Sequence, residues 1–289
     1  MRRLAPLIVL AAAALAASAC APADDSTGAS AASGPAASGA CTPEALPTLE
    51  PGTLTIATDQ PVYEPWMVDD TPENGQGFES AVAYAVADQL GYGKDDVTWT
   101  RVPFNAAIQP GERPFDFDIN QFSITPEREQ AVDFSSPYYR VAQAVITTAG
   151  SPADGATGLA DLRGLRLGAQ VATTSLDVLT GIIAPDSDPV VFNTNDDAKL
   201  ALQNGQVDAI VVDLPTAFYI TAAELDDGVI VGQLEPSGDS GDEFGLLLEK
   251  DSPLTDCVSE AVDALREDGT LGELEQQWLS DVADAPVLS

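Results

Sequence analysis

The chain has 289 residues, with 12 lysines and arginines against 46 aspartates and glutamates, and its formal net charge is −34. Such an acidic chain has too few cations to neutralise phosphates, which excludes nucleic acid as a partner. It contains no histidine, which excludes Ser-His-Asp and Cys-His nucleophilic triads and every metal site that needs an imidazole. The acidity itself indicates a solubility trait rather than a device for binding cations.

The first residues of the chain indicate export. Arg2 and Arg3 precede an apolar run at 4–17 that is too short for a stable membrane span, and small residues then lead to Cys20. This pattern resembles a bacterial lipobox, and the alternative is an ordinary cleaved signal peptide in which the cysteine is incidental. Residues 21–40 are almost all small or polar and predict a flexible tether. A diacylglyceryl group on the cysteine would hold a soluble body at the outer face of the bacterial cell membrane.

Two cysteines remain beyond the tether, Cys41 and Cys257. Export implies an oxidising compartment, so the pair predicts a disulfide rather than a metal site. The bridge would close nearly the whole mature body, which the chain-entropy model values at roughly 5 kcal/mol. The alternative is two unpaired buried thiols.

Short apolar runs alternate with helical patterns along the rest of the chain, which is long enough for one large or two small domains. The patterns predict strands at 53–58, 97–102, 116–121, 139–148, 165–171, 190–192, 207–213, 229–231 and 244–249. They predict helices at 78–90, 175–183, 196–204, 214–224, 253–266 and 271–280. The strand at 207–213 is nearly all apolar, as expected for one buried on both faces of its sheet.

The strand–helix alternation occurs twice and predicts an α/β protein of two lobes. If the two cysteines are bridged, both ends of the body belong to one lobe, and the chain leaves that lobe and returns to it. We therefore expect residues 41–142 and 241–289 in lobe 1 and residues 143–240 in lobe 2. The crossings are expected near 140–145 and 238–243, and such a body can close around a small ligand.

The stretch DINQFSITPEREQAVDFSSPYY contains the most specific chemistry of the chain. It places Arg128 just after a turn at 123–126, and the polar residues Asn120, Gln121 and Ser123 lie at or just beyond the end of the preceding strand. A planar guanidinium beside hydroxyls and free backbone N–H groups can hold a small carboxylate by paired hydrogen bonds. The stretch therefore predicts a receptor for a free amino acid.

Four segments give the chain its resemblance to the family 3 extracellular solute-binding proteins, the amino-acid receptors of ABC importers: 54–66 (LTIATDQPVYEPW), 77–79, 118–139 and 207–213. The resemblance covers residues 52–279. It implies a two-lobed periplasmic-binding-protein-like fold of type II, with two hinge crossings and a ligand cleft between the lobes. It also implies a monomer that works with ABC permease subunits in the membrane and needs no cofactor.

The resemblance assigns a role to each polar group of the ligand. Arg128 would hold the α-carboxylate, together with Thr173 and Thr174 at the start of a helix. Asp213, at the carboxyl end of a buried strand, would take the α-ammonium. Ala172 stands where the family has the glycine of a Gly-Thr-Thr sequence, which leaves the backbone shape of that loop open.

The resemblance places six further residues around the ligand: Ser123, Gln121 and Asn120 in a polar cage, Tyr63 and Phe104 as aromatic walls, and Asp59 where some members hold a cationic side chain. Each of these assignments has a structural alternative. Asp213 could cap the helix that follows it, and Asp59 could serve a turn or a cap. The two aromatic side chains could be ordinary packing, and a tryptophan at position 66 is expected in the core of its lobe.

We expect this chain to bind its ligand without reacting with it. The rival interpretation is a dehydratase acting on a cyclohexadienyl amino acid on the same scaffold, with Glu64 or Glu79 as general acid. A sensory module without transport is a third possibility. The sequence leaves the ligand open, because Asp59 and Glu64 favour a basic side chain whereas Asn120 and Gln121 suit a polar or acidic one.

Overall fold

The structure is a computed structural model that describes residues 41–234, 242–279 and 285–289, which belong to one unit spanning 34–289. The expected signal peptide at 1–20 with Cys20, the tether at 21–40 and part of the second crossing, 238–241, lie outside the described residues. None of the helices in these described ranges is both long enough and apolar enough to cross a membrane.

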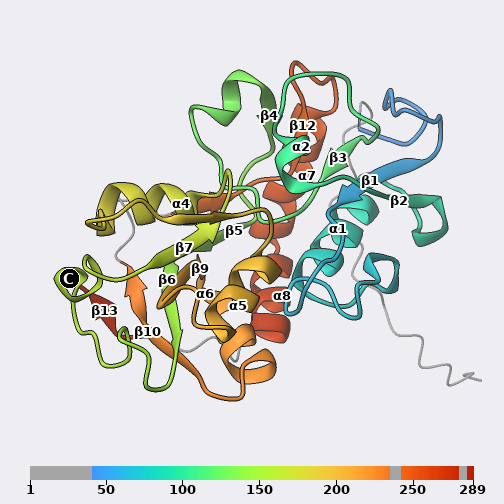
Figure 1. The fold of residues 1–289 in the computed structure, drawn as a ribbon. Coiled ribbons are helices and arrows are strands. Elements are labelled where there is room, and N and C mark those ends of the chain that lie inside the picture. Colours follow the sequence, from blue (N-terminus) through green and yellow to red (C-terminus); the bar gives the residue numbers. More distant parts are fainter. Residues whose placement is uncertain (1–40, 235–241, 280–284) are drawn as a thin grey trace, which may run out of the picture. The chain divides into compact units, whose positions relative to one another are not determined.

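The first half of the fold is a five-stranded sheet with its long helices on one face (Figure 1). Its strands, in spatial order, are β2 (Val97–Arg101), β1 (Leu54–Thr58), β3 (Phe117–Asp118), β12 (Leu247–Glu249) and β4 (Val132–Phe134). The helices are α1 (Phe78–Gln89), α7 (Thr255–Glu267) and α8 (Thr270–Leu279), whose buried side chains share one apolar core with the sheet. A short helix, α2 (Phe104–Ala107), contributes to a smaller apolar cluster that includes Ala57 of β1 and Leu247 of β12.

The second half is a six-stranded sheet with helices on both faces (Figure 1). Its strands, in spatial order, are β13 (Val287–Leu288), β10 (Gly228–Leu234), β6 (Gln143–Thr148), β9 (Ala209–Asp213), β7 (Leu167–Gln170) and β8 (Val190–Phe192). One apolar cluster joins the sheet to α5 (Asn195–Gln203) and α6 (Leu214–Tyr219), and another joins it to α3 (Leu159–Leu162) and the end of the helix that starts with α4 (Thr174–Val178). Helices α4 and α6 each continue into a single π-helical turn.

The predicted buried strand at 207–213 is confirmed in the centre of this sheet. β9 lies between β6 and β7, and its first four residues are buried. Two predicted strands are each divided in the structure, because the chain changes ladder partners there. The run at 139–148 becomes β5 (Tyr139–Val141) and β6, and the run at 244–249 becomes β11 (Asp242–Phe244) and β12. β5 and β11 pair with each other as a separate two-stranded sheet.

A disulfide joins Cys41 to Cys257 in α7, so the predicted bridge is confirmed. The end of the chain differs from the expectation that residues 241–289 as a whole belong to the first lobe. β13 instead extends the six-stranded sheet by pairing in parallel with β10. A two-residue strand with valine and leucine carries no periodicity from which the sequence could have assigned a sheet.

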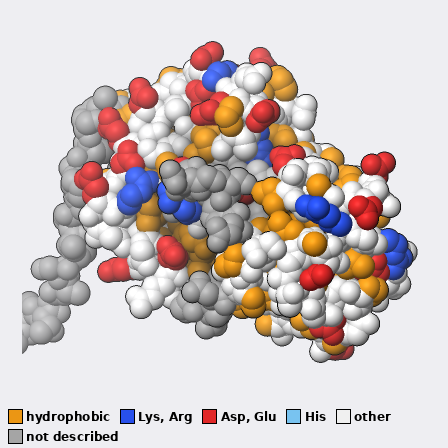
Figure 2. Space-filling view, turned by 90° about the vertical axis from the view of Figure 1, so that its left-hand side faces the viewer, with side chains coloured by type: hydrophobic (Ala, Val, Ile, Leu, Met, Phe, Trp, Pro, Cys, Tyr) orange, Lys and Arg blue, Asp and Glu red, His pale blue; other side chains and the backbone are white. Residues whose placement is uncertain are grey.

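Acidic side chains are distributed over the face shown in Figure 2, with a few lysines and arginines between them. This spread fits the interpretation of the net charge as a property of the solvated surface.

Candidate ligand-binding site

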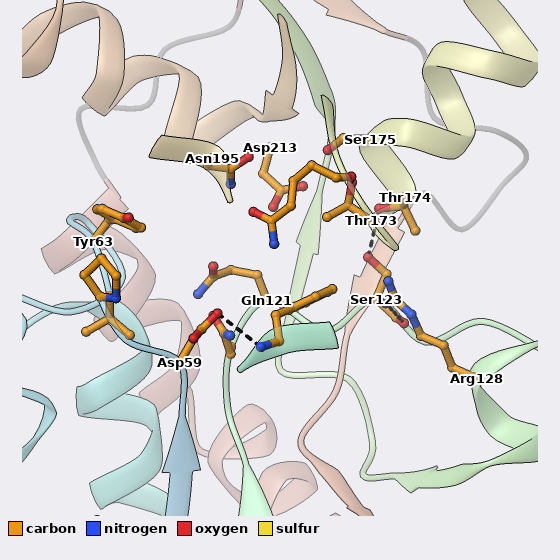
Figure 3. A pocket seen from close by; sticks show the side chains of 15 residues that line it. Asp59, Tyr63, Gln121, Ser123, Arg128, Thr173, Thr174, Ser175, Asn195 and Asp213 are labelled. Carbon is orange, nitrogen blue, oxygen red and sulfur yellow. Dashed lines mark hydrogen bonds between the residues drawn. The ribbon is translucent and has the colours of Figure 1, made fainter. Parts of the chain in front are cut away.

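Side chains from both sheets line one cavity (Figure 3). All ten residues indicated by the sequence are among those lining it: Asp59, Tyr63, Phe104, Asn120, Gln121, Ser123, Arg128, Thr173, Thr174 and Asp213. Most of them follow the carboxyl ends of strands β1, β3 and β9 or begin helix α4. These are the positions at which open α/β sheets place ligand-binding side chains.

Arg128 is the one cation among the residues that line the cavity in the described part of the chain. It opens the 3-10 helix η3 (Arg128–Gln130), and its side chain is buried. Its Nη1 donates to the carbonyl of Ser123 at 2.6 Å, and its Nη2 donates to the carbonyl of Ala172 at 2.9 Å. Burial lowers the pKa of Arg128, but a guanidinium stays charged in proteins. Because it carries five N–H donors, these two bonds fix its plane without exhausting its capacity for a carboxylate.

The start of helix α4 supplies hydroxyls opposite Arg128. Thr173 is the N-cap residue, and its Oγ1 accepts a hydrogen bond from the N–H of Leu176 at 3.2 Å. Thr174 is the first residue of the helix, and its Oγ1 lies 3.2 Å from the Oγ of Ser123. Ala172 adopts φ +63°, the left-handed region that the glycine of the family would favour.

Asp213 is the acidic side chain at the carboxyl end of β9. It precedes α6, but its side chain makes no capping hydrogen bond, so the alternative role as a helix cap is not seen. Its Oδ1 accepts a hydrogen bond from the Nε2 of Gln143 at 2.6 Å. Desolvation raises the pKa of Asp213 to about 7, and the carboxylates of Asp242 and Glu79 add to the rise against the lowering effect of the Gln143 bond. A positively charged group bound here would favour the ionised form.

Gln143 was missed by the sequence analysis, although it organises this part of the site. It opens β6 opposite Asp213 of β9, and its Nε2 also lies 3.0 Å from Asp242 of β11. Its Oε1 accepts a hydrogen bond from the hydroxyl of Ser175 at 2.6 Å. The signal that could have found it is a single amide residue at the start of the apolar run QAVITT.

The buried acid Glu79 accepts hydrogen bonds from Gln121 and fixes its position. It adopts φ +47°, and its N–H donates to the Oε1 of Glu79 at 2.7 Å. The side-chain amide of Gln121 and the hydroxyl of Tyr138 also donate to the Glu79 carboxylate. Glu79 lies in the first turn of α1 with no exposed surface, and its burial raises its pKa to about 7. These hydrogen bonds fix the backbone of Gln121, which lines the cavity.

Tyr63 and Asp59 lie on the side of the cavity away from Arg128 (Figure 3), whereas the ring of Phe104 lies against the guanidinium, with its centre 5.5 Å from the Cζ of Arg128. Phe104 is buried and stacks on Phe122, with ring centres 4.8 Å apart. The carboxylate of Asp59 accepts hydrogen bonds from the backbone N–H groups of Gln60, at 2.6 Å, and Phe104, at 3.1 Å. Asp59 thus has the turn role given as its alternative and also lines the cavity. Trp66 is buried in the core, as expected.

Five further lining residues were not predicted: Pro61, Val62, Gln170, Ser175 and Asn195. Gln170 ends β7 and Asn195 begins α5, so the strand-end and helix-start positions that pointed to Asp213 and Thr174 would have found both of them.

Comparison with known proteins identifies relatives along most of the chain. Residues 54–281 match the bacterial extracellular solute-binding proteins, family 3. The chain is 26% identical over 239 residues to the L-arginine-binding protein of Pseudomonas aeruginosa, covering 78% of this chain and 90% of that protein.

Solved structures give the same result. The chain resembles an ancestral arginine-binding protein bound to glutamine, with 29% identity, a TM-score of 0.65, and coverage of 80% of this chain and 99% of that one. It also resembles the ancestral amino acid-binding protein AncCDT-1, described as a precursor of cyclohexadienyl dehydratase, with 27% identity, a TM-score of 0.63, and coverage of 78% and 95%.

Proposed function

Because this chain belongs to the bacterial extracellular solute-binding proteins of family 3, we propose that it captures a free polar amino acid and delivers it to an ABC importer. Its fold is the two-lobed α/β fold of the type II periplasmic binding proteins. Both the relative and the ancestral structures described above are named as amino-acid-binding proteins, which supports this choice of ligand class.

The observation that carries the proposal is that Arg128 and Asp213 line the same cavity. Arg128 belongs to the half of the fold with the five-stranded sheet, and Asp213 belongs to the half with the six-stranded sheet. A free amino acid is a zwitterion with one carboxylate and one ammonium. Arg128 would take the carboxylate with the hydroxyls of Ser123 and Thr174, and Asp213 would take the ammonium. Removing both ligand charges from water is tolerable because each meets a partner of opposite charge. A shift between open and closed populations would then report the ligand to the permease.

We propose binding without catalysis. Glu79, one of the two acids considered for a dehydratase, is fully buried, and both of its oxygens accept hydrogen bonds from neighbouring residues. It therefore has no route to a ligand as a general acid. Glu64, the other, is not among the residues that line the cavity in the described ranges. The relative and the ancestral structures described above are named as binding proteins, which supports this proposal.

The proposed location is the outer face of the cell membrane, with a lipid on Cys20 as the anchor and permease subunits as the partners. This rests on the extracellular character of the family and on the small residues that precede the cysteine.

A thermal-shift screen of the purified chain against the common amino acids tests the proposal. A ligand at about 100 times its Kd adds roughly 2.7 kcal/mol of stability. We expect at least one amino acid to raise the Tm by several degrees, and we expect Arg128→Ala to abolish that shift. Arg163→Ala, at an exposed arginine, serves as the matched control and should keep the full shift. A well-folded protein whose Tm no amino acid changes would contradict the proposal.

A further inference from the structure

Gln143 lies where the chain passes from one sheet to another. It follows two residues after Val141, which pairs with Asp242 in the two-stranded sheet of β5 and β11. It opens β6 and pairs directly with Asp213, the last residue of β9, in the six-stranded sheet. Side chains directly opposite each other on antiparallel strands lie on the same face of the sheet. The two ladders therefore bring both acids to the same amide.

The hydrogen bonds of the buried Gln143 side chain fix which end of its amide faces the acids. Its Oε1 accepts from the hydroxyl of Ser175 at 2.6 Å. Its Nε2 donates to Asp213 at 2.6 Å and to Asp242 at 3.0 Å, and the Oγ1 of Thr174 lies farther away, at 3.4 Å. An amide nitrogen carries two hydrogens, so the two acids use both of them. The reversed amide would place an oxygen against two carboxylates.

The charges around Asp213 oppose one another. Desolvation contributes most to the raised pKa of Asp213, and the carboxylates of Asp242 and Glu79 raise it further. The amide of Gln143 and the guanidinium of Arg128 lower it. Arg128 is the group proposed to hold the ligand carboxylate, and that carboxylate would offset its charge. Gln143 then remains as the donor that favours an ionised Asp213 while the cavity is occupied.

Resting on the proposed function, we propose that Gln143 is a positioning residue for ligand capture, which holds the Asp213 carboxylate ionised and oriented for the ligand ammonium. An ionised carboxylate offers about four acceptor positions, so one amide bond leaves room for an ammonium. Asp242, on the other hydrogen of the same amide nitrogen, acts in the opposite sense, because its negative charge disfavours that of Asp213.

Isothermal titration calorimetry at several pH values tests this role. The twenty common L-amino acids are titrated into the purified chain at pH 8.5, and the one bound most tightly serves as the probe. The ligand ammonium competes with a proton for Asp213, so the affinity of the unaltered protein should fall below about pH 7, by at most about tenfold per pH unit. Each variant is compared with the unaltered protein at the same pH, which cancels the titration of the probe itself.

Gln143→Met keeps a side chain of similar length and removes the amide donor. Losing a hydrogen bond to the ionised carboxylate should move the fall in affinity to higher pH by about one unit. Relative to the unaltered protein, the variant should therefore lose about five times more affinity at pH 6 than at pH 8.5. A merely structural defect would weaken binding by the same factor at every pH.

Asp242→Asn provides the opposite sign. It keeps the shape of the side chain and removes the charge that raises the pKa of Asp213, so the fall in affinity should move to lower pH. Gln276→Met and Asp256→Asn, at exposed positions of α8 and α7, are the matched controls and should leave the affinity and its pH profile unchanged.

Glu79 also has a pKa of about 7 and titrates in the same range. Its hydrogen bonds come from Gln121 and Tyr138, and both substitutions leave those donors in place. Shifts of opposite sign in the two variants would therefore identify Asp213, rather than Glu79, as the group whose proton competes with the ligand.

The outcomes separate the two proposals. An affinity loss in Gln143→Met that is the same at every pH, or no loss, would overturn the role of Gln143 while leaving amino-acid binding intact. No shift in Asp242→Asn, or a shift to higher pH, would overturn the part assigned to Asp242. If thermal denaturation shows that Gln143→Met does not fold, the profile of Asp242→Asn decides the proposal. Failure of every amino acid to bind would overturn the proposed function and this inference with it.

Discussion

Two acids in the five-stranded half of the protein, Glu79 and Asp118, are equally buried but lie in different surroundings. Glu79 accepts hydrogen bonds from the backbone and side-chain amides of Gln121 and from the hydroxyl of Tyr138. Neither carboxylate oxygen of Asp118 has a hydrogen-bond partner among the described residues. A buried acid surrounded by donors can hold a neighbouring segment in place, whereas one without donors adds only the cost of its burial.

The difference follows from the direction of each side chain. Glu79 lies in the first turn of α1 and reaches the loop that follows β3. Asp118 pairs across the sheet with Ala57 and Leu247, which belong to an apolar cluster. Its burial raises its pKa well above the ordinary value, the charges of Glu79 and Asp59 add to the rise, and Arg113 partly opposes it.

The largest expected effect is the change in the free energy of unfolding when Glu79 is replaced. Glu79→Ala removes the acceptor of three donors, of which the Tyr138 hydroxyl is buried, and we expect it to lower the free energy of unfolding by about 3 kcal/mol. Ligand affinity should fall as well, because Gln121 lines the cavity. Chemical denaturation and calorimetry measure the two effects. Glu273→Ala, at an exposed acid in the first turn of α8, should leave the affinity unchanged and lower the free energy of unfolding by less than about 1 kcal/mol. An unaltered stability would show that the Glu79 network contributes nothing.

Replacing Asp118 should change the free energy of unfolding in the opposite direction. Asp118→Val replaces an unpaired carboxyl by an apolar side chain in an apolar cluster, and we expect it to raise the free energy of unfolding by about 1–3 kcal/mol. Asp116 is the matched control, because its carboxylate accepts hydrogen bonds from the N–H groups of Leu49, at 2.9 Å, and Thr55, at 2.7 Å. Asp116→Val should therefore destabilise the protein. Loss of stability in both variants would contradict the comparison.

The pH dependence sharpens this test. An acid whose pKa is higher in the folded protein stabilises the fold fully below its unfolded pKa, near 4 for aspartate, and loses that contribution as pH rises through the folded pKa. The contribution of Asp118 to the stability of the unaltered protein should thus fall as pH rises from about 4. Asp118→Val lacks this contribution, so its advantage should widen with pH, by at most about 1.4 kcal/mol per pH unit. A constant advantage would show that Asp118 titrates normally.

The sequence predicted which residues meet in one cavity better than it predicted the boundaries of the elements. Arg128, Thr174 and Asp213 each follow a pattern that is local in sequence, a turn or the end of a strand or the start of a helix, and the structure brings all three to one cavity. The division of the run at 139–148 into β5 and β6 depends on which strand pairs with each part. That information lies in distant segments, and periodicity does not contain it.

The same limit applies to the groups that support the site. Gln143 and Glu79 act through partners 70 and 42 residues away along the chain. The sequence places Glu79 at the start of a helix, where an acid is ordinarily stabilising, and this position alone does not reveal its contacts with Gln121 and Tyr138. A buried acid can be assigned a partner only after the sheet has placed the loop that contacts it.

The smallest expected effect compares the two non-glycine residues of the cavity region with left-handed backbones, Gln121 at φ +47° and Ala172 at φ +63°. Hydrogen bonds to Glu79 hold Gln121 in this conformation. The Cβ of Ala172 costs about 1 kcal/mol there, and an alanine side chain makes no hydrogen bond that could offset this cost. Ala172→Gly should therefore raise the free energy of unfolding by about 0.5 kcal/mol, after the entropy of the unfolded glycine is subtracted. Gln121→Gly should lower it, because the bond from its side-chain amide to Glu79 is lost. Denaturant titration of the two variants measures both signs, and a gain in stability for both would mean that Glu79 does not hold Gln121 through that amide.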